Sequence, residues 1–375
     1  MDTTNPFFLG IDIPDEYFCD RENETALLQK HISNGRNVLL TSPRRLGKSG
    51  LIKHFFNQSQ IKKSYSTLYI DIYATHSLEE LVYTWSKALQ NQLKSNTKWY
   101  EQFFKIVTSL RFAFKLDPVT GEPSFELKLG DIEKPDFTLD QIFEYLESEK
   151  KPTIVAIDEF QQVANYEDSD TEAILRSKIQ QCRKTHFIFS GSHQHIMNEM
   201  FLSQNRPFYQ SAIPMNLETI PSETYCKFAS DLFTKFKKKI NSGIIQKVYE
   251  SFEGTTWFVQ TIMNELFALT DKGKTCQEKY IEEAFKNIIL VQEPQFRDQL
   301  ATLPPKQKAL LQAIAKEGSV TNITAAPFIK KYNLSSASSV QASLKGLLAK
   351  QIVSEISEKY RIYDYFFAFW LSRNL

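Results

Sequence analysis

Cysteine is scarce in this chain of 375 residues, and the four cysteines lie far apart. They do not build the sets of closely spaced Cys and His pairs that a zinc site or a redox motif needs. We interpret them as free thiols of a reducing compartment, with a disulfide as the alternative. They are Cys19, Cys182, Cys226 and Cys276.

Long apolar runs are missing too, since nowhere do about 18 apolar residues follow one another. The N-terminal stretch "MDTTNPFFLGIDIPDEYF" has early acidic residues and no basic region followed by an apolar run, as a signal peptide would have. Basic and acidic side chains nearly cancel, 45 against 44, so no whole-protein field favours nucleic acid or an acidic membrane. These absences predict a cytoplasmic protein without a membrane partner.

The apolar content of 42% suffices for the cores of two or three domains at this length. Four short apolar runs, separated by helix-length segments, predict a parallel sheet with helices on both faces. These runs are "NVLLTS", "STLYIDIY", "TIVAID" and "HFIFSG". Between the second and the third, "RFAFKLDPVTGEPSFELKLG" alternates apolar and polar residues and predicts an inserted β-hairpin near residues 111–130.

Amphipathic helices replace the strands from about Ile220 onward. The tail then predicts three helices followed by two strands, the order of a winged helix. We therefore predict an α/β core at residues 1–219, a helical domain at 220–302 and a winged-helix domain at 303–375. Ten Lys/Arg against four Asp/Glu give this last domain a net charge of +6.

The stretch "TSPRRLGKSG" at residues 41–50 lies between a predicted buried strand and a predicted helix, the setting of a phosphate-binding loop. Such a loop directs backbone N–H groups at an anion, while its lysine reaches phosphate and its hydroxyl reaches Mg²⁺. Lys48 and Ser49 fit these roles, although Ser42 stands where such loops begin with glycine. The predicted nucleotide-binding residues here are Ser42, Pro43, Arg44, Arg45, Leu46, Gly47, Lys48, Ser49 and Gly50.

Two further stretches carry polar residues at the ends of predicted strands. In "TIVAIDEF", Asp158 fits a carboxylate that holds Mg²⁺, and Glu159 fits the group that activates the attacking water. Alternatively, the two residues cap the next helix. In "HFIFSGS", Ser190 and Ser192 fit hydroxyls that sense phosphate, or belong to an ordinary turn of small residues.

Taken together, the motifs resemble the archaeal-type ATPase family, a group of AAA+ and STAND P-loop ATPases with a C-terminal winged helix. The resemblance rests on "NPFFLG", "DEYFCDRENE", "SPRRLGKS", "IDEFQ", "FSGS", "NRPFYQSA", "FEGTTWFVQ" and "YRIYDYFFAFWL". It implies an AAA+-type P-loop core, a helical lid over the nucleotide, and ATP with Mg²⁺ as ligands. It also implies adenine-side contacts from Asp20, Arg21 and Glu22, for which an exposed helix cap is the alternative.

The sequence departs from the family pattern at three places. Besides Ser42, the position of a phosphate-sensing arginine is taken by Gln210 and Ser211, so that Arg206 upstream becomes the candidate for this catalytic role. The lid motif, "GTT" at residues 254–256, lacks the proline often found after its glycine.

The two arginines within the loop need a separate interpretation. Arg44 and Arg45 fit contacts with phosphate or with a carboxylate of a partner chain, and a salt bridge within the same chain is the alternative.

For the winged helix, the positive charge favours DNA, but "SSASSVQASLKGLLAK" has only Lys345 and Lys350 as cations. We therefore favour packing against protein, as a partner or in a homo-oligomer, over DNA.

Our main hypothesis is an ATPase that works as a nucleotide-driven conformational switch, with ATP and ADP as its ligands. In it, Lys48 neutralises phosphate, Ser49 and Asp158 hold Mg²⁺, and Glu159 activates water. The alternatives are a non-catalytic nucleotide-binding or DNA-binding or protein-binding module, and a small-molecule phosphotransferase.

Overall fold

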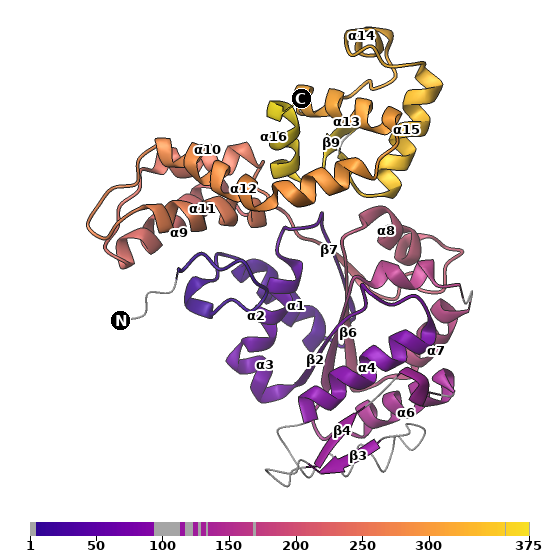
Figure 1. Cartoon of the computed structure of the whole chain (residues 1–375). Coiled ribbons are helices and arrows are strands. Elements are labelled where there is room, and N and C mark those ends of the chain that lie inside the picture. The colour runs from indigo at the N-terminus through magenta and orange to yellow at the C-terminus, as the bar shows by residue number, and fades with distance from the viewer. Residues whose placement is uncertain are drawn as a thin grey trace. The chain divides into compact units, whose positions relative to one another are not determined.

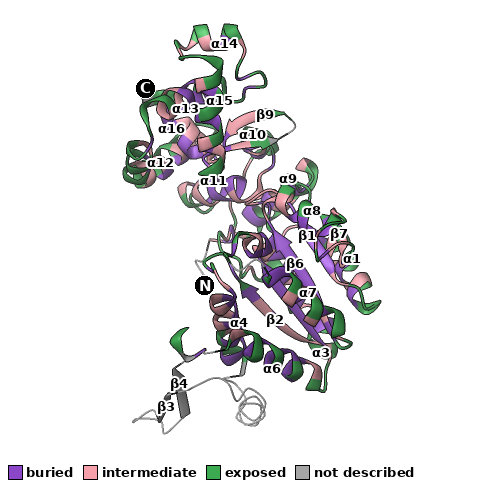
Figure 2. Ribbon diagram, turned by 90° about the vertical axis from the view of Figure 1, so that its right-hand side faces the viewer, coloured by how far each residue is buried: buried purple, intermediate pink, exposed green. Residues whose placement is uncertain are grey.

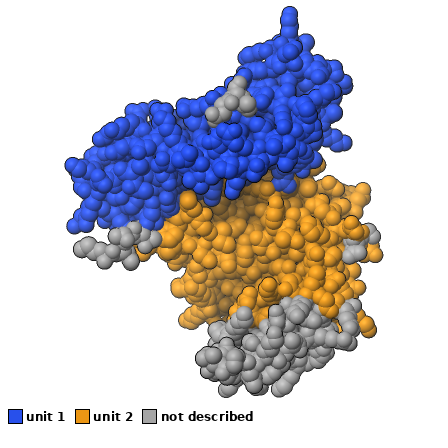
Figure 3. Space-filling view, in the orientation of Figure 1, with its two compact units in different colours: residues 1–7, 222–375 blue, residues 8–221 orange. Residues whose placement is uncertain are grey.

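The computed structural model describes residues 5–93, 113–116, 123–126, 129–132, 134–167, 170–356 and 358–374. The chain forms two compact units (Figure 3). Unit 1 comprises residues 1–7 and 222–375, and unit 2 comprises residues 8–221. The chain therefore passes from one unit to the other twice, near Phe7 and near Pro221.

Unit 2 is built on a parallel sheet of five strands in the order β2-β5-β6-β1-β7. The strands are β1 (Val38–Thr41), β2 (Ser66–Asp71), β5 (Thr153–Asp158), β6 (Thr185–Gly191) and β7 (Ile213–Asn216). The three central strands β5, β6 and β1 are almost wholly buried, as Figure 2 shows for β1 and β6. Their continuous apolar sequences follow from this position, because helices cover both faces of a parallel sheet.

Side chains along each strand alternate between two apolar cores, one on each face of the sheet. Val38 and Leu40 belong to the core shared with α1, α2 and α3, whereas Leu39 belongs to the core shared with α4, α6, α7 and α8. Figure 1 shows these two sets of helices on opposite sides of the sheet. Their bounds are α1 (Glu22–Ser33), α2 (Lys48–Asn57), α3 (Ser59–Ser64), α4 (Leu78–Leu93), α6 (Pro135–Ser148), α7 (Thr171–Gln181) and α8 (Gln194–Leu202). The predicted α/β architecture is confirmed.

Sequence patterns identified four of the five strands and missed β7. This strand has only four residues and includes Pro214. A central strand forms hydrogen bonds with a neighbour on each side, and proline has no N–H to donate. Within sheets, proline is therefore found mainly in edge strands. As the last strand in the order, β7 pairs only with β1.

Unit 1 begins with helices α9 (Ser222–Lys235), α10 (Ser242–Ser251), α11 (Thr256–Leu269) and α12 (Lys279–Ala301). α12 continues past Pro294, which lies inside the helix. The N-terminal residues also belong here, because the Phe7 ring packs against Phe233 and Phe267 at centroid distances of 5.7 and 5.9 Å. Asn264 Nδ2 donates to the Phe7 carbonyl at 2.8 Å.

The rest of unit 1 has the order predicted for a winged helix. Its elements are α13 (Pro305–Glu317), α14 (Ala326–Lys331), α15 (Ala337–Ala349), β8 (Val353–Ile356), β9 (Lys359–Ile362) and α16 (Tyr365–Asn374). β8 and β9 pair antiparallel, and a further bridge joins Val320 to Tyr360. The aromatic tail belongs to the core, since Phe366 and Trp370 are buried.

The winged-helix elements and the preceding helices share an aromatic core. The Phe252 ring contacts Phe258 of α11, Phe285 of α12 and Phe366 of α16 at centroid distances of 5.6–5.7 Å. Arg361 of β9 also forms an ion pair with Glu253. These contacts explain why the two parts form one compact unit.

The hairpin predicted near residues 111–130 falls mainly outside the described residues. Within that stretch, β3 (Ala113–Leu116) and β4 (Pro123–Glu126) form an antiparallel pair. The described residues also include three short 3₁₀ helices, η1 (Asp15–Tyr17), η2 (Leu129–Asp131) and η3 (Phe160–Asn165). In the part of the chain that the structure describes, no helix has the length and apolarity needed to cross a membrane.

Candidate functional site

The predicted phosphate-binding loop connects the end of β1 to the start of α2. Gly47, directly before α2, has φ +95°, a left-handed conformation that side chains rarely adopt. A Cβ at this position would meet no atom within 4 Å, so the backbone conformation and not the space requires glycine here. Arg45 also has a positive φ, +67°. The loop therefore turns sharply into the N-terminus of α2.

Lys48 points back into the loop. Its Nζ donates to the Ser42 carbonyl at 3.0 Å, to Ser42 Oγ at 3.2 Å and to the Pro43 carbonyl at 3.2 Å. The residue is only 6% exposed. This burial lowers the pKa of Lys48, and the carboxylates of Glu159 and Asp158 act in the opposite direction.

Ser42 is fully buried, and its hydroxyl takes part in this arrangement. Ser42 Oγ donates to the Pro43 carbonyl at 2.9 Å and accepts from Lys48 Nζ. The side chain that departs from the family pattern thus adds one acceptor for the lysine, a role that glycine does not have.

Asp158, at the end of β5, is 3% exposed and accepts hydrogen bonds from three groups. Ser49 Oγ and the Tyr69 hydroxyl each donate to Oδ2 at 2.5 Å, and the Glu159 N–H donates to Oδ1 at 3.0 Å. The structure therefore brings together the two residues predicted to hold Mg²⁺. Tyr69 was missed, although β2 carries it beside β5. Burial, followed by the charge of Asp158, raises the pKa of Tyr69, so its hydroxyl keeps the proton it donates.

Glu159 follows with φ +56°, an unusual conformation for a residue with a side chain. Its Oε2 accepts from Gln161 Nε2 at 2.5 Å and from Ser192 Oγ at 2.8 Å. Arg44 Nε donates to the same Ser192 hydroxyl at 3.2 Å. The loop is thus connected to Glu159 through Ser192, and Gln161 is a further residue that the sequence analysis missed.

Ser190 is the last residue but one of β6, which pairs with β5, and Ser192 directly follows this strand. Ser190 is fully buried, and its hydroxyl has no hydrogen-bond partner among the described residues. A buried hydroxyl without a partner costs about 1–3 kcal/mol, which makes it a candidate ligand contact.

Arg21 makes contacts other than those predicted for it. It is 4% exposed, and its guanidinium donates to the Glu218 carbonyl at 2.7 Å, to Glu24 Oε1 at 2.6 Å and to the Leu46 carbonyl at 3.5 Å. It thereby ties the chain after β7 to the phosphate-binding loop. Asp20 before it has φ +59° and is half-buried, and Glu22 is exposed.

Arg206 lies in an ion pair with Glu172, the first turn of α7, and its Nη1 is 3.8 Å from Glu199 Oε1. Among the described residues, no hydrogen bond or ion pair links Arg206 to the loop, to Asp158 or to Glu159. The structure does not bring this residue together with the others.

Comparison with known proteins identifies the family. Residues 18–262 match a family described as an ATPase domain predominantly from Archaea, which is more than half of the chain. The chain belongs to this family. Residues 294–373 of this archaeal-type ATPase match a probable winged helix domain, which confirms the assignment of the tail. No curated protein matches the chain.

Solved structures with the same fold include the Walker-type ATPase of Pyrococcus abyssi, at 19% identity and TM-score 0.67, covering 98% of this chain and 99% of that one. The ORC2 protein of Aeropyrum pernix, in its ADPNP–ADP complexes, is 13% identical with a TM-score of 0.60 and coverages of 98% and 95%. The ORC1 protein of Aeropyrum pernix in complex with DNA is 11% identical with a TM-score of 0.53 and the same coverages. At these identities the likeness shows the fold, a P-loop ATPase core with helical and winged-helix parts.

We expect the contacts of Arg21 to stabilise unit 2. Replacing Arg21 with alanine leaves two backbone carbonyls and Glu24 without their charged donor. The expected loss in the free energy of unfolding is about 2–4 kcal/mol. Chemical denaturation followed by fluorescence measures it, with exposed Arg36→Ala as a control that changes it by less than about 0.5 kcal/mol. Equal stability of both variants would contradict the role of Arg21.

Proposed function

We propose that this archaeal-type ATPase binds ATP with Mg²⁺ and hydrolyses it. The observation that carries the proposal is the meeting of two separate motifs, in which the Ser49 hydroxyl and the Asp158 carboxylate lie 2.5 Å apart. In P-loop ATPases, groups of these two types hold Mg²⁺ beside the phosphates. The family match supports ATP as the ligand, and the ADPNP–ADP complexes of ORC2 are in keeping with it.

Lys48 neutralises phosphate in this proposal. When a nucleotide enters, its ammonium exchanges the oxygens of Ser42 and Pro43 for phosphate oxygens. Backbone N–H groups of residues 44–50 donate to the same phosphates, because the first N–H groups of α2 have no partner within the helix.

Ser49 and Asp158 are the residues that would hold Mg²⁺, which neutralises phosphate charge when bound. A hydroxyl and a carboxylate are hard oxygen ligands of the kind Mg²⁺ prefers, and this ion keeps several waters instead of needing a full set of protein ligands. The donors present therefore fit the ion. Tyr69 holds the Asp158 carboxylate in place by donating to the same Oδ2 as Ser49.

Glu159 accepts the proton of the attacking water. Its Oε2 already accepts from Ser192 and Gln161, which hold the carboxylate in one orientation. Ser190 contributes the unpartnered hydroxyl at the end of β6 as a contact for phosphate or water. For Arg206 to stabilise charge on the phosphoryl group, its ion pair with Glu172 has to open first.

We propose adenine-side contacts for Asp20 and Arg21, and the hydrogen bonds of Arg21 limit which of its groups can make them. Because the Arg21 guanidinium is engaged with Glu24 and with backbone carbonyls, its backbone and Asp20 are the groups left to contact a base.

We further propose that the chain has three functional parts, residues 1–219, 220–302 and 303–375. ATP binding and hydrolysis would switch the chain between two conformations of these parts. The aromatic core around Phe252 supports a common movement of the second and third parts. A protein partner or a second copy is the favoured target of the winged helix. DNA is the second candidate, favoured by the charge of +6 and by the DNA complex of ORC1.

The first experiment measures ATP binding and phosphate release on the same variants. Lys48→Ala is expected to abolish Mg·ATP binding in calorimetry, whereas Glu159→Gln is expected to bind ATP and release phosphate at least about 100-fold more slowly. Lys63→Ala, an exposed lysine of α3, is the control and should behave as the wild type. Unchanged ATP affinity of Lys48→Ala would reject the site, and unchanged turnover of Glu159→Gln would reject the role of Glu159.

Tyr69→Phe tests how the Asp158 carboxylate is positioned. Losing a hydrogen bond to a charged group costs about 1.5 kcal/mol, so we expect the Mg²⁺ concentration for half-maximal ATP binding to rise about tenfold. ATP affinity in the presence of EDTA should not change, because no phosphate contact is lost. Tyr65→Phe, whose ring lies beside His186, is the matched control. An unaltered Mg²⁺ dependence would show that Tyr69 has only a packing role.

Ser42→Ala tests the added acceptor in the loop. Without the hydroxyl, Lys48 loses one of three oxygens in the nucleotide-free state. This loss is worth about 1 kcal/mol, so nucleotide should bind about fivefold more tightly. Weaker binding in calorimetry would show instead that the Ser42 hydroxyl serves the nucleotide-bound state.

A further inference from the structure

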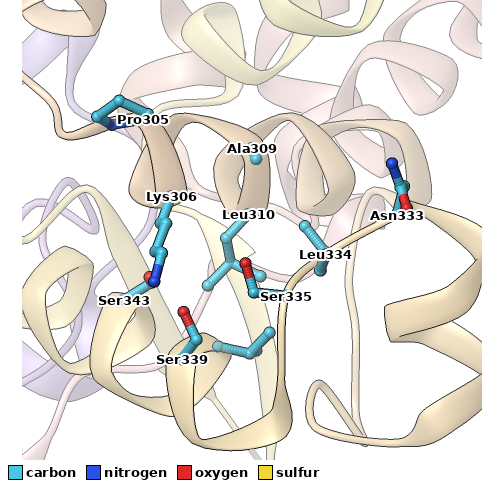
Figure 4. A pocket seen from close by; sticks show the side chains of 10 residues that line it. Pro305, Lys306, Ala309, Leu310, Asn333, Leu334, Ser335, Ser339 and Ser343 are labelled. Atoms are coloured by element: carbon cyan, nitrogen blue, oxygen red, sulfur yellow. The ribbon is translucent and has the colours of Figure 1, made fainter.

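A pocket of about 190 Å³ opens in the winged-helix part of unit 1, beside the N-terminal ends of α13 and α15 (Figure 4). Lys306 enters it from the first turn of α13, and Ser339 and Ser343 enter it from α15. All residues that line it lie within unit 1 and none belongs to the predicted ATP site. The pocket therefore needs an explanation of its own.

Two serines of α15, Ser339 and Ser343, line the pocket from one face of the helix, because residues four apart in a helix share a face, and Ser335 lies just before the helix. Ser335 at the helix entrance is exposed, Ser339 is half-buried and Ser343 is only 7% exposed. Within the described residues, the Ser343 hydroxyl makes no hydrogen bond. Because Ser343 lines the pocket, a ligand there can supply the hydrogen bond that its hydroxyl lacks among the described residues.

The electrostatics of the pocket favour an anion. Lys306 has no ion-pair partner among the described residues, and no acidic residue lines the pocket. The first two turns of α13 and of α15, each a helix of 13 residues, supply lining residues, so the positive halves of both helix dipoles lie nearer to the pocket than the negative halves. Helix N-termini, lysine and hydroxyl donors are the groups that proteins use to bind phosphate.

One wall of the pocket is apolar and is formed by Leu310, Leu334 and Val340. It offers no partner to a phosphate oxygen, but it suits the carbon part of an attached group. We propose that the pocket binds a phosphate group, with Lys306, Ser339 and Ser343 on its oxygens and the esterified carbon against this wall. The phosphate belongs either to a small phosphate ester or to a nucleic-acid backbone, and these sources share the same contacts.

The experiment uses the full chain carrying Lys48→Ala, so that phosphate at the predicted ATP site does not obscure the result. Inorganic phosphate, phenyl phosphate and a short DNA duplex are titrated, the first two by calorimetry and the duplex by fluorescence anisotropy. Lys306→Ala and Ser343→Ala are each introduced separately into the Lys48→Ala chain. Lys308→Ala, on the same helix but outside the pocket lining, is the matched control.

We expect phenyl phosphate to bind more tightly than inorganic phosphate, and each pocket variant to weaken it at least about fivefold, the value of one hydrogen bond. Lys308→Ala should change affinity less than twofold, by about 0.4 kcal/mol or less. If only the affinity for the duplex depends on Lys306 and Ser343, the pocket binds a phosphate of the nucleic-acid backbone, and the proposal is supported. If no probe binds at millimolar concentration, or if all variants bind alike, the proposal is wrong.

Stability without ligand gives a second measurement. Ser343→Ala removes an unpaired buried hydroxyl, so its midpoint of thermal unfolding should be equal to or higher than that of the parent chain. A lower midpoint would show that the hydroxyl has a structural partner, and this would overturn the argument from its unpaired state.

Discussion

The buried carboxylate of Asp158 is the group on which the arrangement of the site depends. A carboxylate that is 3% exposed has to be hydrogen-bonded. Two of its donors come from elements distant in sequence, Ser49 in α2 and Tyr69 in β2, and the third is the N–H of the next residue, Glu159. The parallel sheet makes this possible, because the carboxyl ends of its strands all lie at one edge. The same edge holds Glu159 and Ser192, so one topological feature accounts for the whole cluster.

Much of the fold was predictable, because it depends on local patterns. Buried strands such as Thr153–Asp158 are continuous apolar runs, and Gly47 stands where the loop needs a left-handed residue. The features that the sequence did not predict depend on partners distant in sequence. Tyr69 contributes to the site only because β2 pairs with β5, and Arg21 binds carbonyls that lie 25 and 197 residues further along the chain. Nothing in the local sequence around these residues encodes such partners.

Unit 1 combines parts that the sequence presents as separate. The chain begins in it with Phe7, leaves it for the whole of unit 2 and returns at Ser222. Both crossings are covalent, and Phe7 is fully buried against Phe233 and Phe267. The two units are thus joined at two points of the chain. Within unit 1, Phe252 links the helices to α16, so the winged helix cannot shift alone without separating aromatic contacts.

At Ser42, the structure explains what a departure from the phosphate-loop motif does to the loop. A loop that opens with glycine has no side chain at this position, and its lysine is left with backbone oxygens alone. Here a fully buried hydroxyl donates to Pro43 and accepts from Lys48, so the nucleotide-free loop is better satisfied than a glycine loop would be. Any ligand has to compete with this extra bond, and binding is a difference between two states. In the proposed function, the departure therefore acts on the strength of nucleotide binding, whereas the backbone of the loop remains suited to phosphate.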